Sequence, residues 1–524
     1  MFIDVKHRSE YILAALMLCS LIVRLSMFSG FVLGDDPAYA ELVPPLLNNA
    51  YPALRVHDVI ACRPIVLYAI AFCIHLFGWH EWSFVLPVLC ASLLNTAIVY
   101  CAGVKLGGIR AGFFAAAAFI VFPLDAVHAT TMCNDIMLST FVWGGGLLLL
   151  LCKDISSNRA AQALAFISGL VAGAGVGVKF NAIVAPVLFV GLGFLYVLRS
   201  GRFYKVLVSW IAGWLVANAV LCLFFYKICG DFLAHYHTEM QLYLDNYSSG
   251  VFMPDTTSLQ EALLSYPASI GIAGLWTGNY EIQELPYGFF YLAFLLCVPL
   301  CIFPRFKALR LPSLCALFYL LIMEFFPLKI YPHYVPINRL PRYLHIASIP
   351  AAVALGIVFS CLLRFRSGIL KISTALVFLF FLATSWYWAW VPASMYKDCA
   401  MDCRQAWDAV QNIPAKEIIT DSEMRNYFLF RSGFKPRWRM ERFAKIPSRL
   451  PADAIVITGG ARRPEMFTKY AHSWLDGKKI DPELQVFESP CDLRLWRFSK
   501  LAIYKTDRQI ELGDFDPPAE DEHQ

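Results

Sequence analysis

The sequence has few charged residues: aspartate, glutamate, lysine and arginine make up 16% of its 524 residues. Soluble domains carry about 25%, so this share excludes an ordinary soluble protein. The formal net charge is only +5, and no basic block of the kind that binds nucleic acid is present. In contrast, 58% of the residues are hydrophobic and 15% are aromatic. Long apolar runs of this composition predict a polytopic α-helical membrane protein.

The sequence also lacks the cysteine patterns of metal sites. None of its 16 cysteines forms a Cys-x-x-Cys pair or a Cys/His spacing typical of zinc. Most of them lie in apolar runs, where cysteine acts as a small apolar side chain. No metal is therefore predicted. A divalent ion stays an open alternative, for example at His235 and His237, although a solvated role is favoured for these two histidines.

Eleven apolar runs come close to the length of about 20 residues that a membrane-spanning helix needs. They lie at about 11–33, 82–104, 111–124, 135–152, 162–178, 181–198, 206–227, 287–304, 311–328, 343–363 and 372–391. Arg24 lies inside the first run and could pair with Glu324 or with a lipid. The sequence thus predicts about eleven transmembrane helices.

Basic residues occur in alternate short loops between these runs. After Lys6 and Arg8 they are Lys105/Arg110, Lys153/Arg159, Arg199/Arg202/Lys205, Arg305/Lys307/Arg310 and Arg364/Arg366/Lys371. Lysine and arginine mark cytoplasmic loops, so the N-terminus is predicted to be cytoplasmic and the acidic loops to lie outside. This parity excludes Arg63–Phe77 as a crossing, and that apolar segment is expected to be a juxtamembrane or re-entrant helix. A bacterial inner membrane is assumed.

The predicted transmembrane domain covers residues 1–394 and has large outer loops at 34–81 and 229–286. After Trp390 the charges become dense, and short strands are expected at 417–420, 454–458 and 493–496. Residues 395–511 are therefore predicted to form a small extracytoplasmic α/β domain, in which Cys399, Cys403 and Cys491 could form a disulfide in more than one way. The tail, 512–524, is acidic and proline-containing and is expected to be disordered.

Acidic and basic residues gather at the outer ends of the predicted helices. Ionisable residues near a membrane are candidates for function, and the sequence places nine candidate site residues on the outer face: Asp35, Asp36, Tyr39, Arg63, His128, Asp135, Lys179, Arg342 and Tyr343. A carboxylate can take a proton from an attacking hydroxyl. Lysine and arginine can bind a phosphate leaving group, arginine with two parallel hydrogen bonds. This combination suits group transfer from a lipid phosphate at the membrane surface.

Four motifs occur in a fixed order along the chain. They are Asp35-Asp36-Pro37-Ala38-Tyr39; Arg63-Pro64 opening an apolar segment; Phe122-Pro123 with His128 and Asn134-Asp135; and a glycine-rich helix that ends in Lys179. In these motifs the chain resembles the GT-C class of membrane glycosyltransferases, within it the protein O-mannosyltransferases and lipid A aminoarabinose transferases. Asp36 stands where glutamate is usual in that class, and Ile65 where a second proline is frequent.

The resemblance implies a polyprenyl-phosphate-linked sugar as donor, a lipid, glycan or protein hydroxyl as acceptor, and inversion at the anomeric carbon. Asp35 matches the first acid of the family motif and is the expected general base. Asp36 could raise its pKa by like-charge repulsion, and Asp135 is expected to orient the site. Arg63, Lys179 and Arg342 are expected to bind the donor phosphate. Tyr39, His128 and Tyr343 are expected to orient substrates.

Structural roles are open alternatives for several of these residues. Asp36 and Asp135 could each cap a helix, and Arg342 could extend to the membrane interface. Lys179 could contact lipid headgroups, and His128 is more typical of a polar loop residue. Two other functions compete with the enzyme: a transporter or flippase of lipid-linked sugars, and an inactive scaffold. A transporter would place its ionisable residues nearer the bilayer midplane, so surface chemistry is favoured.

Overall fold

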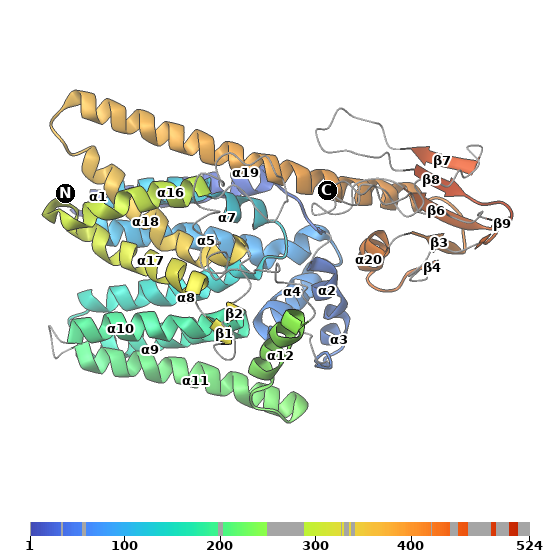
Figure 1. Ribbon diagram of the computed structural model, residues 1–524, viewed down its shortest axis with the longest axis horizontal. Coiled ribbons are helices and arrows are strands. Elements are labelled where there is room, and N and C mark those ends of the chain that lie inside the picture. Colours follow the sequence, from blue (N-terminus) through green and yellow to red (C-terminus); the bar gives the residue numbers. More distant parts are fainter. Residues whose placement is uncertain are drawn as a thin grey trace.

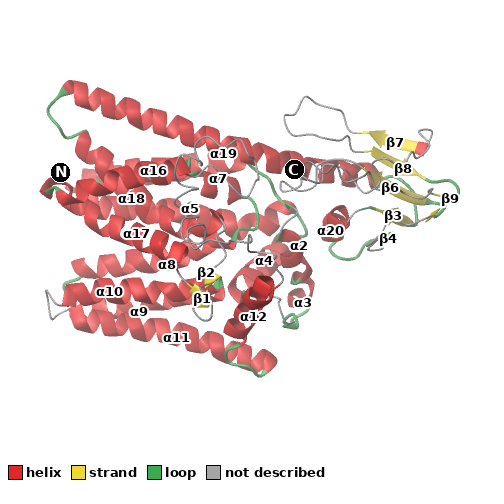
Figure 2. Ribbon diagram, in the orientation of Figure 1, coloured by secondary structure: helices red, strands yellow, loops and turns green. Residues whose placement is uncertain are grey.

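The protein is a bundle of long helices joined to a small sheet domain (Figures 1 and 2). The computed structural model describes residues 2–32, 35–54, 59–197, 203–248, 288–325, 327–329, 335–336, 341–420, 422–440, 449–458, 484–488 and 502–511. In the part of the chain that the structure describes, the strands form two short antiparallel pairs and one five-stranded sheet. The predicted fold class, a polytopic helical protein with a small α/β part, is confirmed.

The N-terminal half is helical almost throughout its described residues. Its elements are α1 Phe2–Ser26, α2 Asp36–Glu41, α3 Val43–Leu47, α4 Pro64–Phe77, α5 Glu81–Gly107, α6 Ile109–Ile120, α7 Pro123–His128, α8 Asn134–Leu151, η1 Cys152–Asp154, α9 Asn158–Ala174, η2 Gly175–Gly177, η3 Phe180–Val184, α10 Ala185–Val197, α11 Phe203–Cys229 and α12 Ala234–Ser248.

The C-terminal half completes the bundle and then forms the sheet domain. Its helices are α16 Gly288–Cys297, η4 Val298–Ile302, η5 Pro304–Leu309, α17 Arg310–Phe325, η6 Pro341–Leu344, α18 His345–Leu362, α19 Gly368–Val410 and α20 Ser422–Arg431. Its strands are β1 Pro327–Lys329, β2 Val335–Pro336, β3 Glu417–Ile419, β4 Arg439–Met440, β5 Arg449–Leu450, β6 Ala454–Thr458, β7 Gln485–Glu488, β8 Ala502–Lys505 and β9 Ile510–Glu511.

Helices occur at all eleven predicted positions. Among the described residues, eight helices are long and apolar enough to cross a membrane, and four shorter apolar helices accompany them, at Pro64–Phe77, Ile109–Ile120, Phe180–Gly193 and Gly288–Ile302. The first of these four, α4, is the segment predicted to be juxtamembrane or re-entrant. The number of crossings stays a prediction, because length and composition alone do not fix it.

Helix α18 is the centre of the bundle. Of its most apolar stretch, 94% is buried inside the protein, whereas the corresponding share is 17% in α1 and 22% in both α11 and α19. The outer helices therefore present apolar side chains to their surroundings, as helices that face lipid do. Since η6 leads directly into α18, residues 341–344 are attached to the most buried of the eight long apolar helices among the described residues.

The helix α1 ends earlier than predicted, at Ser26 instead of Leu33. The backbone at Gly30 has φ +81°, which glycine adopts readily, and a Cβ atom there would lie 2.2 Å from Oε2 of Glu81. The chain therefore leaves the helix and passes close to Glu81 before it reaches Asp35. This irregular segment leads to α2 at the end of the bundle nearer the sheet domain (Figure 1).

The sheet domain contains a five-stranded mixed sheet in the order β4-β3-β6-β8-β7. The β3–β4 and β3–β6 pairs are parallel, and β8 is antiparallel to both of its neighbours. Strands β3 and β6 lie where two strands were predicted; the third, 493–496, lies outside the described residues. Cys491, the side chain of Cys399 and the tail 512–524 also lie outside them, so the disulfide and the disorder of the tail stay predictions.

One 43-residue helix, α19, connects the bundle to the sheet domain. Its membrane-compatible part is Gly368–Ser394, and the remainder extends beyond the bundle toward the sheet (Figure 1). The predicted domain boundary at residues 394 and 395 thus falls inside a continuous helix. The helix contains Pro392, which removes one backbone hydrogen bond near that boundary.

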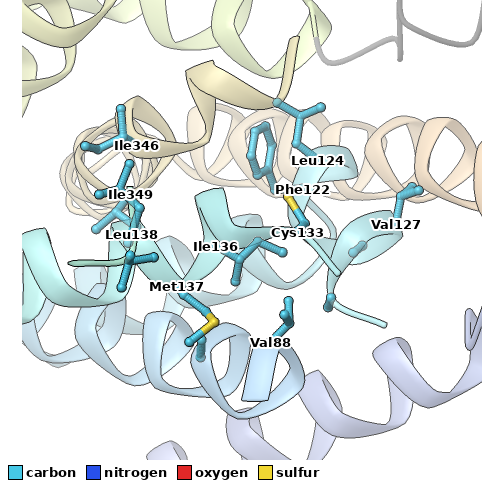
Figure 3. Close-up of a cluster of buried hydrophobic side chains, with 14 of the residues drawn as sticks. Val88, Phe122, Leu124, Val127, Cys133, Ile136, Met137, Leu138, Ile346 and Ile349 are labelled. Carbon is cyan, nitrogen blue, oxygen red and sulfur yellow. The ribbon is translucent and has the colours of Figure 1, made fainter. Parts of the chain in front are cut away.

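Apolar packing fixes the helix that carries Asp135. Cys133, Ile136, Met137 and Leu138 are all buried and lie among Val88, Phe122, Leu124, Val127, Ile346 and Ile349 (Figure 3). These side chains come from α5, α7, α8 and α18 and from the residues that directly precede α7 and α8. A fully buried aliphatic side chain contributes about 1.5–3 kcal/mol, so the start of α8 has little freedom to move relative to the start of α18.

Candidate active site

The structure brings the predicted acids and bases together at the end of the bundle that faces the sheet domain. Nη1 of Arg342 lies 2.9 Å from Oδ2 of Asp35. Nζ of Lys179 donates a hydrogen bond of 2.6 Å to Oδ1 of Asp135. Nε of Arg342 lies 3.9 Å from Oδ2 of Asp135. The four residues come from segments separated by up to 307 positions, and they form one alternating cluster of two carboxylates and two cations.

Lys179 lies in the break between two helical segments. Helix α9 ends at Ala174 and the 3₁₀ turn η2 that follows it ends at Gly177. Lys179 then has an extended backbone with φ −160° and ψ 135°. Its ammonium nitrogen lies 3.7 Å from the centre of the Tyr343 ring, a cation–π contact. Its side chain is only 4% exposed. Lys179 therefore points into the cluster, and the alternative in which it contacts lipid headgroups does not fit this placement.

The carboxylate of Asp35 is the accessible one of the three candidate acids. Its side chain is 38% exposed, whereas that of Asp135 is 3% exposed and Asp36 as a whole is 4% exposed. Asp35 precedes the first turn of α2 and makes no side-chain cap. Of the three carboxylates, Asp35 is therefore the one that an incoming hydroxyl group can reach.

Burial alone would raise the pKa of Asp35, but Arg342, Arg63 and Lys179 outweigh it and bring the pKa below its ordinary value. Like-charge repulsion from Asp36 therefore does not raise the pKa of Asp35 above its ordinary value, because the attraction of the three cations dominates the balance. The repulsion acts in the other direction, because burial and the charge of Asp35 raise the pKa of Asp36 well above its usual range.

Asp36 holds the backbone around the site. Its Oδ2 accepts a 2.8 Å hydrogen bond from the backbone N–H of Val32, and its Oδ1 accepts one of 3.3 Å from the N–H of Met132. Asp36 is thus neither a helix cap nor exposed to substrate. It ties the segment before Asp35 to the loop before α8. Likewise, Asp135 is not an N-cap, since α8 begins at Asn134 after Cys133.

Arg63 and Tyr39 form a second part of the site. Nη1 of Arg63 donates a hydrogen bond of 2.5 Å to the hydroxyl of Tyr39, and both side chains are buried. Burial raises the pKa of Tyr39 to about 12, so its hydroxyl stays protonated. Arg63 directly precedes α4, and Pro64 occupies the first position of that helix, where proline is favoured. The motif therefore places a cation at the N-terminal end of α4.

His128 borders the cluster. It is the last residue of α7, its ring centre lies 5.7 Å from that of Tyr396, and its Nδ1 lies 3.5 Å from the hydroxyl of Thr131. Loss of solvation, with a contribution from Arg342, lowers the pKa of His128 to about 4. The imidazole is therefore neutral at neutral pH. His128 contacts α19, the helix that leads to the sheet domain.

A buried network lies beneath the cluster that the sequence did not predict. Nη2 of Arg24 is 2.6 Å from Oδ1 of Asp125, and Nε2 of His345 is 2.9 Å from Oδ2 of the same residue. Nδ1 of His345 lies 2.7 Å from Oγ of Ser139, which donates to the backbone oxygen of Asp135. Arg24 thus pairs with Asp125, and neither of the predicted partners, Glu324 or a lipid, fills this place.

A second unpredicted cluster joins the site to the sheet domain. Glu81 accepts hydrogen bonds from Arg404, with Nη2 to Oε2 at 2.6 Å, and from the hydroxyl of Tyr427 at 2.7 Å. Arg404 also donates to the backbone oxygen of Ser29 at 2.6 Å. Next to it, the rings of Phe31 and Phe430 stack with their centres 4.4 Å apart. The segment that leads to Asp35 is thus anchored on α19 and α20.

Among the described residues, no three histidine, cysteine, aspartate or glutamate side chains gather to hold a metal ion. Residues 249–287, 330–334 and 337–340 lie outside the described residues. That no metal is bound therefore stays a prediction.

The fold resembles solved membrane glycosyltransferase structures. ArnT from Cupriavidus metallidurans, bound to undecaprenyl phosphate, matches over 94% of this chain and 97% of its own, with 14% identity and a TM-score of 0.57. The oligosaccharyltransferase of Archaeoglobus fulgidus matches over 82% of this chain and 64% of its own, with 12% identity and a TM-score of 0.51. The chain has the GT-C fold. Among curated proteins, none matches the sequence significantly.

Residues 62–226 match the family model of dolichyl-phosphate-mannose-protein mannosyltransferases. The matched segment contains three of the four motifs, with Arg63, Asp135 and Lys179. The family match and the fold agree with the resemblance to GT-C glycosyltransferases that the motifs predicted. They also support a multi-pass membrane protein.

Proposed function

We propose that the protein is an inverting glycosyltransferase that moves a monosaccharide from a polyprenyl-phosphate donor to a hydroxyl group of a lipid, glycan or protein of the cell envelope. The observation that supports this most is the placement of Asp35. It is an accessible, ionised carboxylate 2.9 Å from Arg342, beside a group of cations suited to a phosphate. A base and a phosphate site in contact are what the reaction needs.

In the proposed reaction, the Asp35 carboxylate accepts the proton of the acceptor hydroxyl while the oxygen of that hydroxyl attacks the anomeric carbon of the sugar. The bond between the anomeric carbon and the phosphate oxygen breaks, and its electron pair leaves with the polyprenyl phosphate. Arg342, Lys179 and Arg63 stabilise the charge of that phosphate. Asp135 holds Lys179, and Tyr39 and Tyr343 hold the arginine and lysine in place.

The same proposal assigns the site and the sheet domain to the outer side of a bacterial inner membrane, with the N-terminus in the cytoplasm. Its support is the alternation of basic and acidic loops along the sequence. Residues 395–511 are proposed as an extracytoplasmic domain that helps to bind the acceptor, because it contacts the segment leading to Asp35 through Glu81 and Arg404.

The test is sugar transfer from radiolabelled polyprenyl-phosphate monosaccharides, comparing wild type with Asp35→Asn at equal expression. We expect transfer to fall by about 10²–10⁴-fold, the usual range for loss of a general base, while donor binding is kept. Undiminished transfer would remove Asp35 from the mechanism. Transport of the lipid-linked sugar across vesicle membranes without any transfer would favour the flippase instead.

A further inference from the structure

Helix α12 presents two buried polar side chains next to the proposed phosphate-binding cations. His235 and Glu239, one helical turn apart, have side chains that are 7% and 5% exposed. Within the part of the chain that the structure describes, both ring nitrogens of His235 and Oε1 of Glu239 have no hydrogen-bond partner. A buried polar group without a partner costs about 1–3 kcal/mol, so these atoms indicate a place where a ligand supplies the missing hydrogen bonds.

The distances leave room for one hydrogen-bonding group between them. Oε1 of Glu239 lies 4.0 Å from Nη2 of Arg63 and 4.0 Å from Nε2 of His235. Both separations are too long for a direct hydrogen bond. When two atoms lie 4.0 Å apart, a ligand oxygen near their midpoint, displaced to one side, can lie about 2.8 Å from both and form a hydrogen bond with each. The Nε atom of Arg63 also lacks a partner among the described residues.

The packing around α12 holds the two side chains in this place. The ring centre of His235 lies 5.3 Å from that of Phe180 and 6.0 Å from that of Phe225. Phe180 follows Lys179 directly, so the histidine packs on the same segment that supplies a cation to the cluster. The neighbouring histidine, His237, points away, since its side chain is 58% exposed and binds Asp231.

The charges at this place determine which ligand chemistry fits. Burial, with Arg63 adding to it, lowers the pKa of His235 to about 3, so the ring is neutral. Burial raises the pKa of Glu239, while Arg63 and Lys179 oppose this rise. A phosphate group would be repelled by the Glu239 carboxylate, and a metal ion by the nearby guanidinium of Arg63. A hydroxyl group, which both donates and accepts, satisfies the carboxylate, the imidazole and the guanidinium together.

We propose that His235 and Glu239 form a binding site for hydroxyl groups of the donor sugar, beside the cations that bind the donor phosphate. This inference rests on the proposed function and makes it more specific. In the donor, the sugar is bonded directly to the phosphate. Arg63, one of the proposed phosphate-binding cations, lies 4.0 Å from Glu239, so the sugar of a bound donor would lie beside Glu239. Glu239 and His235 thus recognise the group that is transferred, and they make no contact that the bare lipid phosphate needs.

The experiment compares two ligands that differ only in the sugar. Purified full-length protein is titrated with undecaprenyl phosphate and with undecaprenyl-phosphate mannose and undecaprenyl-phosphate aminoarabinose. The variants are Glu239→Gln and His235→Phe, and His237→Phe is the matched control on the same helix. We expect the first two variants to weaken binding of a sugar-bearing lipid by about tenfold, a typical effect of one hydrogen bond to a charged group, and to leave binding of undecaprenyl phosphate unchanged. The control should change neither.

Three results would overturn the inference. Equal weakening for both kinds of ligand would show that the pair only supports the fold, and unchanged binding of the sugar-bearing lipids would show that the pair does not contact the sugar. In both cases wild-type sugar transfer would leave the proposed function standing. If the wild type neither transfers sugar nor prefers a sugar-bearing lipid to undecaprenyl phosphate, the proposed function and this inference fail together.

Discussion

The guanidinium of Arg342 lies 2.9 Å from the carboxylate of Asp35 and joins the segment before α18 to the segment before α2. The pair has an exposed fraction of about a third on each side, 32% for Arg342 and 38% for Asp35. Arg342 lies in η6, which directly precedes α18, the most buried of the long apolar helices among the described residues. Its contact therefore holds the carboxylate of Asp35, which follows an irregular segment, in a defined position.

This pair sets the expected pH dependence of transfer. Asp35 has a pKa below its ordinary value, and its proton-accepting form is lost only as the pH falls through that lowered pKa. We therefore expect kcat/KM of the wild type to show no acid limb from Asp35 above about pH 4, the usual pKa of aspartate. In Arg342→Gln the limb should move to higher pH, because the main lowering charge is gone. A wild-type limb above about pH 5 would contradict this assignment of the base.

Asp36 should behave differently from Asp35, although the two are adjacent. Asp36→Asn keeps only one oxygen for the two backbone N–H groups of Val32 and Met132. A buried donor left unpaired costs about 1–3 kcal/mol, so the free energy of unfolding should fall by that amount. Asp35→Asn should change stability by less than about 0.5 kcal/mol, as most accessible substitutions do. Unfolding of both variants in detergent measures the contrast, and equal stabilities would refute it.

The buried pair of Arg24 and Asp125 should show strong coupling. Asp125→Asn leaves the fully buried guanidinium of Arg24 without its counter-charge, and breaking such a pair costs about 3–5 kcal/mol. The double variant Arg24→Met with Asp125→Asn should lose less than the sum of the single variants, because it removes both charges. A double-mutant cycle on the free energy of unfolding tests this coupling. Additive losses would show that the two charges do not depend on each other.

Glu81 and Arg404 should connect the sheet domain to catalysis. Glu81→Gln removes the charge that holds Arg404, and with it the contact of Arg404 to Ser29 is weakened. We expect a lower kcat by about tenfold, with unchanged binding of undecaprenyl phosphate, because one charge-assisted hydrogen bond contributes about 1.5–3 kcal/mol. Lys416→Met is the control, since it breaks the exposed pair with Asp453. A change in lipid binding instead of kcat would place Glu81 in the donor site.

There is a physical reason why the sequence predicted the helices and the residues that meet in the cluster of two carboxylates and two cations. Long apolar runs have few alternatives to a membrane helix, and charges at their ends are expensive to place elsewhere. Asp35, Asp135, Lys179 and Arg342 each follow or precede such a run, so placing the run ends on one face also places these side chains together. The ends of the apolar runs were sufficient to predict that these four side chains lie at one end of the bundle, and their roles stay proposals.

Other parts of the site depend on packing that the sequence does not display. Asp35 and Asp36 are neighbours in one motif, yet the turn into α2 exposes the first and buries the second. Arg24 and Asp125 are 101 residues apart and meet only because α1 packs against α5, α6 and α7. His235 and Glu239 lie in a polar outer segment without a motif. Burial of both side chains is the signal that distinguishes them, and only the structure shows it.

The continuity of α19 gives the sheet domain a fixed rotational phase relative to the bundle. An α-helix turns by about 100° per residue, so Arg404 faces Glu81 only while the number of residues between Ser394 and Arg404 is unchanged. Adding one residue there would turn Arg404 away from Glu81, whereas adding a whole number of turns would restore its direction at a greater distance. The number of residues in this part of α19 therefore determines whether Arg404 can contact Glu81, independently of which residues they are.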